Sequence, residues 1–327
     1  MNELERRYRR LLRAYPVDYR RERGDEIVGT YLDLAVPERR WPSLADANDL
    51  LRGGLRQRLR ASGATDLLPG VRIAGLLALT TAAFLAGFWA TVERNGPNPE
   101  WGVPSFGPFV SVGVIAWFAW LAPALLMLVA PGRATRVAVT VAVLATAVVP
   151  VVGGLAGAPR PPLYVLAPQL ALGVLALAVG DRLPLLARAL PGVAALTGVG
   201  TALALVGPGS YWGWYGWTAE QLLPATGTVL LVVAFLLAIG LGMRRDERGG
   251  WATVVLLTPI GLLNLHILAG AVDGLASGAP RPTYPTMVAA AIAVALLGPA
   301  LLPAAVALRR RLRVRPAASC PTCGAHR

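Results

Sequence analysis

The segment IAGLLALTTAAFLAGFWATV, residues 73–92, runs for its whole length without a charged side chain. A helix that crosses the hydrocarbon core of a bilayer needs about 20 mostly apolar residues. Further apolar runs of similar length follow it, near residues 109–130, 137–157, 163–180, 189–206, 221–243, 251–271 and 286–308. The sequence therefore predicts an all-α fold, a polytopic membrane protein with about eight transmembrane helices.

The charged residues indicate how these helices are oriented. They make up only 15% of the chain, against about 25% in a typical soluble domain. With the N-terminus inside, the internal loops and tail hold most of the interhelical arginines, namely Arg133, Arg136, Arg182, Arg188, Arg244, Arg245, Arg248, Arg309, Arg310, Arg311, Arg313 and Arg315. The external loops hold only Arg94, Arg160 and Arg281. Because basic loops stay on the cytoplasmic side, we expect a multi-pass protein of the cell (plasma) membrane with both termini in the cytoplasm.

Aromatic residues give a second indication of the same orientation. Amphipathic rings favour the headgroup region, and the predicted outer face carries Trp101, Tyr164, Tyr211, Trp212, Trp214, Tyr215, Trp217 and Tyr284. The formal net charge of +13 fits internal loops that contact anionic lipid. We do not expect a nucleic-acid partner.

Two pairs of external loops resemble each other. GLAGAPRPPLY at 154–164 is echoed by GLASGAPRPTY at 274–284, and GPNPEWGVPSFG at 96–107 more loosely by GPGSYWGWYGW at 207–217. Chance similarity between short Gly/Pro loops is one explanation, and duplication is the other. Duplication predicts a 4+4 parallel repeat within the transmembrane domain 73–308, with halves 73–180 and 189–308.

Residues 1–62 are rich in both charge signs and predict a small N-terminal cytoplasmic helical bundle, joined to the membrane by a linker, 63–72. Ser43 and Asp46 have the spacing of a helix capping box. Three amphipathic helices are expected from the apolar stripes Leu4, Tyr8, Leu11, Leu12 and Tyr15; Tyr19, Ile27, Tyr31 and Leu34; and Leu44, Leu51, Leu55 and Leu59. About 60 residues are near the lower limit for an independent core. We therefore expect this head to need the membrane, a second copy or a partner.

The segment RRYRRLLRAYPVDYRRERGDEIVGTYLDLA, residues 6–35, resembles the N-terminal segment of a group of uncharacterised actinobacterial integral membrane proteins. It also resembles, more distantly, the HAAS-type signalling domain and the permease prefix domain, both helical. The matching features are Tyr15-Pro16, the run Arg-Glu-Arg-Gly at 21–24, and Asp25-Glu26. The resemblance implies a regulatory role and a cytoplasmic protein partner in a PadR-like regulator system. No permease signature follows downstream.

Polar residues within the predicted spans are few. Asn264 and His266 lie in the seventh run and form a possible intramembrane polar site, either as a hydrogen bond between helices or as a proton relay. Glu93, Asp181 and Asp273 fall at the predicted ends of spans, where we expect them to face water.

The tail, residues 309–327, is basic and ends in CPTCGAHR. Cys320 and Cys323 have the spacing of one zinc knuckle, and His326 could supply a third ligand. Zinc in a structural site takes four ligands, so a second chain would complete the site and make a homodimer. The alternatives are an inert reduced tail and a redox pair, since a cytoplasmic disulfide is disfavoured.

The motifs of several enzyme classes are missing from the sequence. There is no lysine to complete a Walker loop, no HExxH, and no GxSxG with partners for a triad. We therefore expect a non-enzymatic integral membrane protein whose head is regulatory or docks a partner. The alternative is a transporter or permease-like protein with a pathway between the two four-helix halves.

Overall fold

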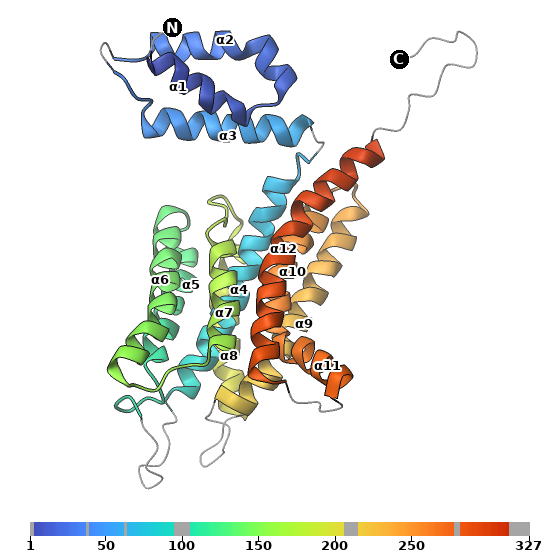
Figure 1. Ribbon diagram of the computed structural model, residues 1–327. Helices are drawn as coiled ribbons and strands as arrows, with labels where there is room; N and C mark the ends of the chain where they lie inside the picture. Colours follow the sequence, from blue (N-terminus) through green and yellow to red (C-terminus); the bar gives the residue numbers. More distant parts are fainter. Residues whose placement is uncertain are drawn as a thin grey trace, which may run out of the picture. The chain divides into compact units, whose positions relative to one another are not determined.

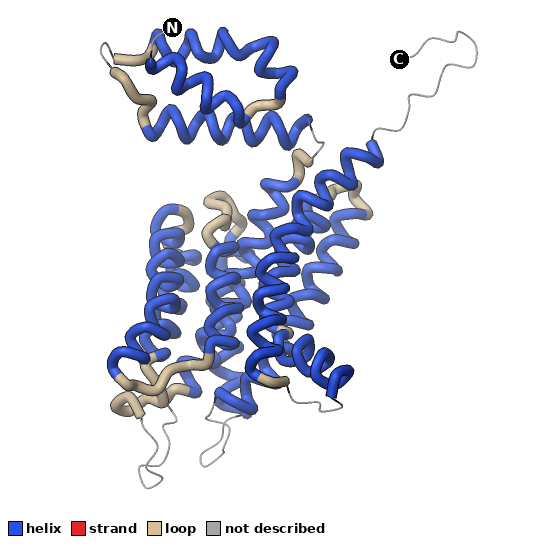
Figure 2. The backbone as a smooth tube through the Cα atoms, in the orientation of Figure 1, coloured by secondary structure: helices blue, strands red, loops and turns tan. Residues whose placement is uncertain are grey.

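The computed structural model describes residues 3–36, 39–61, 64–94, 105–205, 215–277 and 282–313. Within these ranges all regular structure is helical, and the only strand-like feature is an isolated bridge between Phe106 and Phe109 (Figures 1 and 2). The chain divides into two compact units, residues 1–67 with 303–327 and residues 68–302. The all-α prediction is confirmed at this level.

The N-terminal head contains three helices around one small core. They are α1 (Glu3–Leu11), which continues into the 3₁₀ turn η1 (Leu12–Ala14), α2 (Val17–Asp33) and α3 (Leu44–Ala61). Pro16 immediately precedes α2, where a residue without an amide hydrogen costs nothing. The buried core consists of Leu4, Tyr8, Leu12, Tyr15, Val28 and Leu50. The apolar face predicted for the first helix thus packs into the core of the head.

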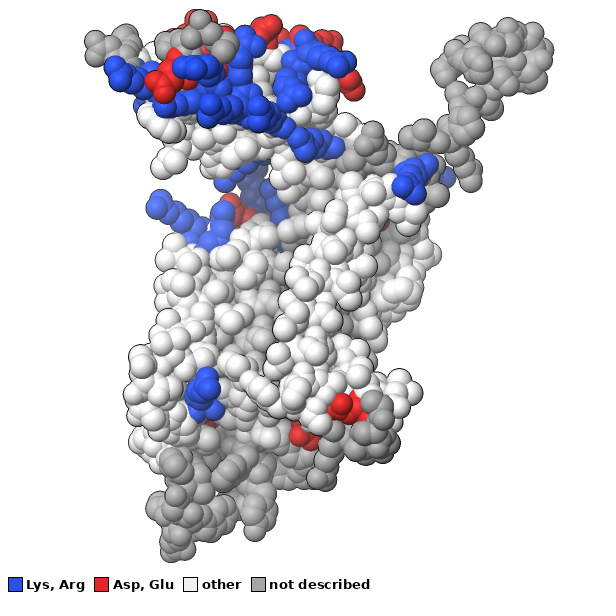
Figure 3. All heavy atoms as spheres, viewed as in Figure 1, with Lys and Arg blue, Asp and Glu red and all other residues white. Residues whose placement is uncertain are grey.

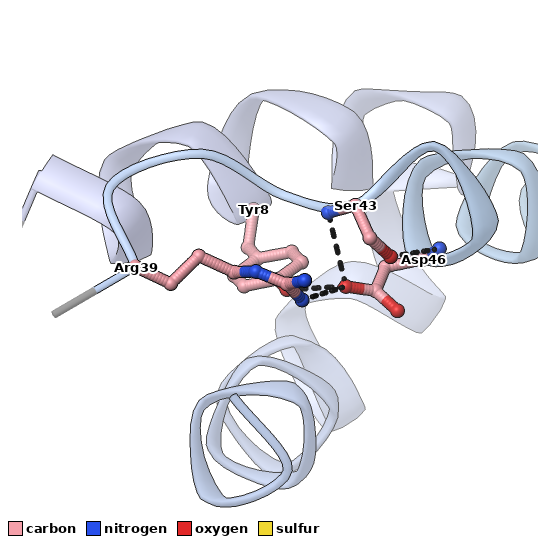
Figure 4. Close-up of polar contacts among 4 residues, drawn as sticks. All are labelled: Tyr8, Arg39, Ser43 and Asp46. Carbon is pink, nitrogen blue, oxygen red and sulfur yellow. Dashed lines mark hydrogen bonds and ion pairs between the residues drawn. The ribbon is translucent and has the colours of Figure 1, made fainter. Parts of the chain in front are cut away.

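The capping box predicted at the start of α3 is confirmed (Figure 4). The Ser43 amide donates to Oδ2 of Asp46 at 3.1 Å, and the Asp46 amide donates to Oγ of Ser43 at 3.0 Å. The Tyr8 hydroxyl donates to the same carboxylate at 2.9 Å, and Arg39 lies 3.7 Å from it. The Ser43 hydroxyl therefore caps an amide in the first turn of α3, and the Asp46 carboxylate accepts from the Ser43 amide and from Tyr8 of α1.

Of the apolar stripe predicted for α3, Leu59 is buried, but Leu44, Leu51 and Leu55 expose 91%, 49% and 49% of their surface, so the stripe is wrong for these three. Leu50 of α3 faces the core instead, together with Gly54, where an added Cβ would lie 2.7 Å from Cβ of Ala14. A glycine surface lets the helix approach η1 closely, so α3 turns its glycines inward and leaves these leucines outside.

The second unit contains the apolar helices, the last of them as far as Leu302. Their bounds are α4 (Leu67–Val92), α5 (Gly113–Val129), α6 (Arg133–Ala156), α7 (Leu163–Ala176), α8 (Leu185–Leu205), α9 (Tyr215–Gly242), α10 (Arg248–Leu263), α11 (Leu265–Ser277) and α12 (Tyr284–Arg313). Five of them, α4, α6, α8, α9 and α12, are long and apolar enough to cross a membrane. The pair α10–α11 passes the same test together but is bent by 65°, and α5 and α7 are shorter apolar helices. These helices indicate a membrane protein.

The outward faces of these helices carry large apolar side chains. Leu144 of α6 is 58% exposed, Leu196 of α8 is 74% exposed and Leu296 of α12 is 68% exposed. Figure 3 shows the visible face of the helices in residues 68–302 as almost free of charged side chains, whereas charges crowd the head. An exposed apolar surface of this extent is unfavourable in water and matches a hydrocarbon environment.

Small residues let the central helices approach closely. A Cβ added to Gly87 of α4 would lie 2.1 Å from the carbonyl oxygen of Ala195 of α8. A Cβ added to Gly198 of α8 would lie 2.1 Å from the carbonyl oxygen of Phe84 of α4. Because lipid is as apolar as the side chains, such backbone packing is a main source of helix association in membranes.

Candidate functional site

A cavity of about 650 Å³ lies between α4, α8 and α9. Its wall on α4 extends from Leu77 to Phe88, in the middle of that helix, and α9 contributes residues as far as Val233. The lining is mostly apolar, and none of the described residues that form it is charged. The volume lies within the range of small-molecule sites in proteins.

The polar side chains that line this cavity are six threonines and Gln221. Five of the threonines donate to the carbonyl oxygen four residues earlier in their own helix, at 2.7 to 2.9 Å. The residues concerned are Thr80, Thr81, Thr197, Thr201 and Thr226. Their donors are therefore engaged, and their methyl groups add to the apolar surface that an occupant would contact.

A buried carboxylate lies next to this cavity, at the end of α4. Glu93 is fully buried and accepts hydrogen bonds from the amide of Ser111 at 2.7 Å, from the Ser111 hydroxyl and from the Tyr215 hydroxyl. The indole of Trp117 donates to the Tyr215 oxygen at 2.8 Å. We call these four residues the Glu93 network. It joins α4, α5 with the residues just before it, and the first turn of α9.

Aromatic rings connect the Glu93 network to the cavity wall. The Trp89 ring lies 4.7 Å from that of Tyr215 and 5.2 Å from that of Phe88, which lines the cavity. The indole nitrogen of Trp89 is buried and has no hydrogen-bond partner among the residues that the structure describes. The same layer of rings thus contacts the carboxylate network on one side and the cavity on the other.

Sequence reasoning missed this network. Glu93 was expected to face water at the end of its span, and Tyr215 was expected among headgroups, but Glu93 is 0% and Tyr215 7% exposed. Both expectations are wrong because the partners are 18 and 122 positions from Glu93 along the chain. Neither helical periodicity nor a short motif carries information over such separations.

The other two acidic residues at predicted span ends, Asp181 and Asp273, also have polar partners. Asp181 pairs with Arg136, and Asp273 accepts from the Thr283 amide at 2.6 Å and from the Thr286 hydroxyl at 2.7 Å. Both carboxylates are partly exposed, so water contact and these partners coexist.

The structure places Asn264 and His266 in two different surroundings. Asn264 ends α10 at the 65° bend, and its amide donates to the carbonyl oxygen of Ile260 in the same helix at 2.8 Å. His266 lies on α11, with its Nε2 atom 3.9 Å from Oε1 of Glu220 on α9. Its ring meets Tyr164 of α7 edge-on, at 4.6 Å between centroids. The 3.9 Å separation from Glu220 is too long for a hydrogen bond, and Asn264 bonds within its own helix, so the interhelical hydrogen bond and the proton relay both stay predictions.

The predicted metal ligands Cys320, Cys323 and His326 lie outside the described residues. Among the residues that the structure does describe, no group of three or more His, Cys, Asp or Glu side chains is placed to hold a metal ion. The zinc knuckle stays a prediction from the sequence.

Comparison with models of known protein families, with curated proteins and with solved structures found no match. The resemblance of residues 6–35 to HAAS-type and permease prefix domains therefore stays a prediction. The cavity between α4, α8 and α9, with the adjoining Glu93 network, is the site that the geometry supports.

Proposed function

We propose that this chain is a non-enzymatic, multi-pass membrane protein that binds a lipophilic molecule in the cavity between α4, α8 and α9. We also propose that its role is regulatory, with the head as the part that docks a cytoplasmic protein partner. The single observation that carries the ligand proposal is the apolar cavity of about 650 Å³ lined by the middle of α4.

The chemistry of the cavity wall selects the class of ligand. An apolar cavity holds water poorly, because water needs two to four polar partners. Five of the six threonine donors around this cavity are already bonded within their own helices. A hydrocarbon body is the complementary occupant, since it leaves no buried polar group unsatisfied.

A lipophilic ligand of this cavity would exchange with the surrounding lipid, and this limits where its binding affinity can come from. A lipophilic molecule gains little from leaving the bilayer, because lipid tails are equally apolar. Affinity must therefore come from close van der Waals contact with a shaped wall, including Phe84 and Phe88. A molecule whose shape fits this wall is expected to be enriched over bulk lipid.

Lipid analysis of the purified protein tests this proposal. Full-length protein is extracted into detergent, and co-purified compounds are compared by mass spectrometry with the total membrane extract. In Ala225→Trp an indole occupies part of the cavity, whereas Leu236→Trp places the same ring on an exposed site of the same helix. We expect one compound enriched in wild type and Leu236→Trp and lost from Ala225→Trp. The same lipid profile in all three proteins and in the membrane would overturn the proposal.

A transporter of lipophilic molecules is the second candidate. It is favoured by the position of the cavity, which lies between α4 of the first predicted half and α8 and α9 of the second. The assay uses proteoliposomes with an NBD-labelled phospholipid and dithionite outside. Faster loss of inner-leaflet fluorescence than in protein-free vesicles, slowed by Ala225→Trp, would favour transport. Ligand retention without this flux would favour the regulatory role.

We further propose eight spans with both termini in the cytoplasm, so that α5, α7 and the bent pair α10–α11 also cross. With 17 and 14 residues, α5 and α7 measure about 25 and 21 Å, and packing between longer helices would shield their ends. The arginine distribution supports this orientation. A tag fused after Arg327 should stay unreachable to an impermeant reagent on intact cells, and labelling there would contradict the topology.

The 4+4 parallel repeat has support from the contact between α4 and α8. Gly87 meets Ala195, and Gly198 meets Phe84. Gly198 follows Gly87 by the same number of positions as Ala195 follows Phe84. If α4 and α8 are exchanged, the contact of Gly87 with Ala195 therefore becomes the contact of Gly198 with Phe84. The same offset aligns the loops that begin at Gly96 and Gly207. This pattern is expected of two halves related by an axis along the membrane normal.

A further inference from the structure

The exposed face of α3 carries apolar side chains that its own bundle does not use. Leu44, Leu51 and Leu55 expose 91%, 49% and 49% of their surface. Their spacing of seven and four positions places them on one side of the helix. The head thus presents a row of leucines that we call the α3 leucine row.

The charges in the second half of α3, around Leu51 and Leu55, are of one sign, whereas Asp46 and Asp49 lie near Leu44 in the first half. Residues 50–61 read LLRGGLRQRLRA and contain no acidic side chain. Arg52, Arg56 and Arg60 are exposed there, and Arg58 donates from its guanidinium to the carbonyl oxygen of Arg13. The second half of α3 therefore combines exposed leucine with exposed guanidinium groups, the composition of a helix that lies in a membrane interface.

A short connection joins α3 to α4. The amide of Ala64 donates to the carbonyl oxygen of Leu59 at 2.8 Å, and Ala64 is buried. After α3 ends at Ala61, the apolar helix α4 begins at Leu67. Even a fully extended chain of this length spans only about 20 Å, so an α4 that crosses the bilayer as proposed leaves the end of α3 within reach of the bilayer surface.

We propose that the α3 leucine row and its flanking arginines bind the surface of a bilayer that contains anionic phospholipid. The leucines enter the boundary between headgroups and acyl chains, while the guanidinium groups stay with the lipid phosphates. Anionic lipid is the occupant that satisfies both features at once, because it offers an apolar layer beneath negative charge. This inference is independent of the ligand proposed for the cavity.

Fluorescence quenching in nanodiscs tests the proposal on the full-length chain. The background is Cys320→Ser with Cys323→Ser, and a single NBD label is placed through Leu51→Cys. The matched control is Leu34→Cys, an exposed leucine (77%) on the segment that ends α2. Discs holding one copy contain phosphatidylglycerol and phosphatidylcholine, with a doxyl group near the headgroup of some acyl chains. We expect about twofold stronger quenching at position 51 than at position 34.

Charge reversal then tests the electrostatic part. Arg52→Glu together with Arg56→Glu should lower the quenching at position 51, and high salt should act in the same direction because it screens surface charges. Equal quenching at both positions would overturn membrane binding. Equal quenching in discs of phosphatidylcholine alone would overturn the requirement for anionic lipid. Protection of position 51 only in discs with two copies would show that a second head covers the row instead.

Discussion

The hydroxyl of Tyr215 on α9 donates a hydrogen bond to the carboxylate of Glu93 at the end of α4, across 122 positions of sequence. Replacing this tyrosine by Tyr215→Phe removes one of the donors to a buried carboxylate and leaves the Trp117 indole without its acceptor. A buried acceptor that loses its donor typically costs about 1–3 kcal/mol. We expect a lower melting temperature in detergent than for wild type. Tyr284→Phe, at a 65% exposed position, should melt like wild type, and equal melting of all three proteins would contradict a stabilising Glu93 network.

The close approach of α4 and α8 depends on Gly198. A Cβ at this position would meet the Phe84 carbonyl oxygen at 2.1 Å, whereas a Cβ added to Gly200 in the same helix would have no atom of the described residues within 4 Å. Gly198→Ala should therefore force the helices apart and cost about 1–3 kcal/mol. Gly200→Ala should be neutral or slightly stabilising, since alanine is the better helix former. Thermal unfolding of both variants in the same detergent measures the difference, and a reversed order would exclude this contact.

The capping box of α3 predicts an acid sensitivity of the head. Hydrogen bonding by Ser43 lowers the pKa of the Asp46 carboxyl, and burial raises the pKa of Tyr8, which also bonds to it, to about 12. A carboxyl whose pKa is lower in the folded state stabilises above its ordinary value of about 3.9, and this contribution is lost as the pH falls through the folded value. A side-chain cap is worth about 1 kcal/mol.

Hydrogen exchange of residues 44–50 in the full-length protein, corrected for intrinsic rates, measures this effect. Asp46→Asn should lower protection at neutral pH and match wild type in strong acid. Asp33→Asn, at an exposed position near the end of α2, should behave as wild type throughout. If Asp46→Asn kept the full pH dependence of wild type, another group would be responsible.

The spacing of Cys320 and Cys323 predicts that the purified protein contains zinc. If Cys320 and Cys323 form one zinc knuckle, purified full-length protein should contain zinc, about half an equivalent per chain when two tails share one ion with four cysteine ligands. Cys320→Ser with Cys323→Ser should lose it, as measured by inductively coupled plasma mass spectrometry. Metal-free wild-type protein from a gentle preparation would leave the inert and redox interpretations.

Local regularities made the helices predictable. Each of the eight apolar runs covers most of one helix, or for 251–271 most of the α10–α11 pair, because the requirement for continuous apolar side chains acts on neighbours in sequence. Ser43 and Asp46 were predictable for the same reason, since a capping box is complete within four residues.

Long-range packing was not predictable. The close approach of Gly54 to Ala14 determines which face of α3 points inward. The spacing of the leucines in α3 does not predict this contact. The bend after Leu263 interrupts an apolar run that reads as one continuous helix. The carboxylate of Glu93 finds its partners through the arrangement of α5 and α9, which the sequence alone does not specify.

The hydrogen bonds of the cavity threonines within their own helices affect which ligands the cavity would select. Because Thr80, Thr197 and Thr226 donate to carbonyl oxygens of their own helices, the wall that they form should select a ligand by length and bulk rather than by functional group. A homologous series of hydrocarbons should therefore pass through an optimum of size, while a hydroxyl added to the body of the best member should only weaken its retention.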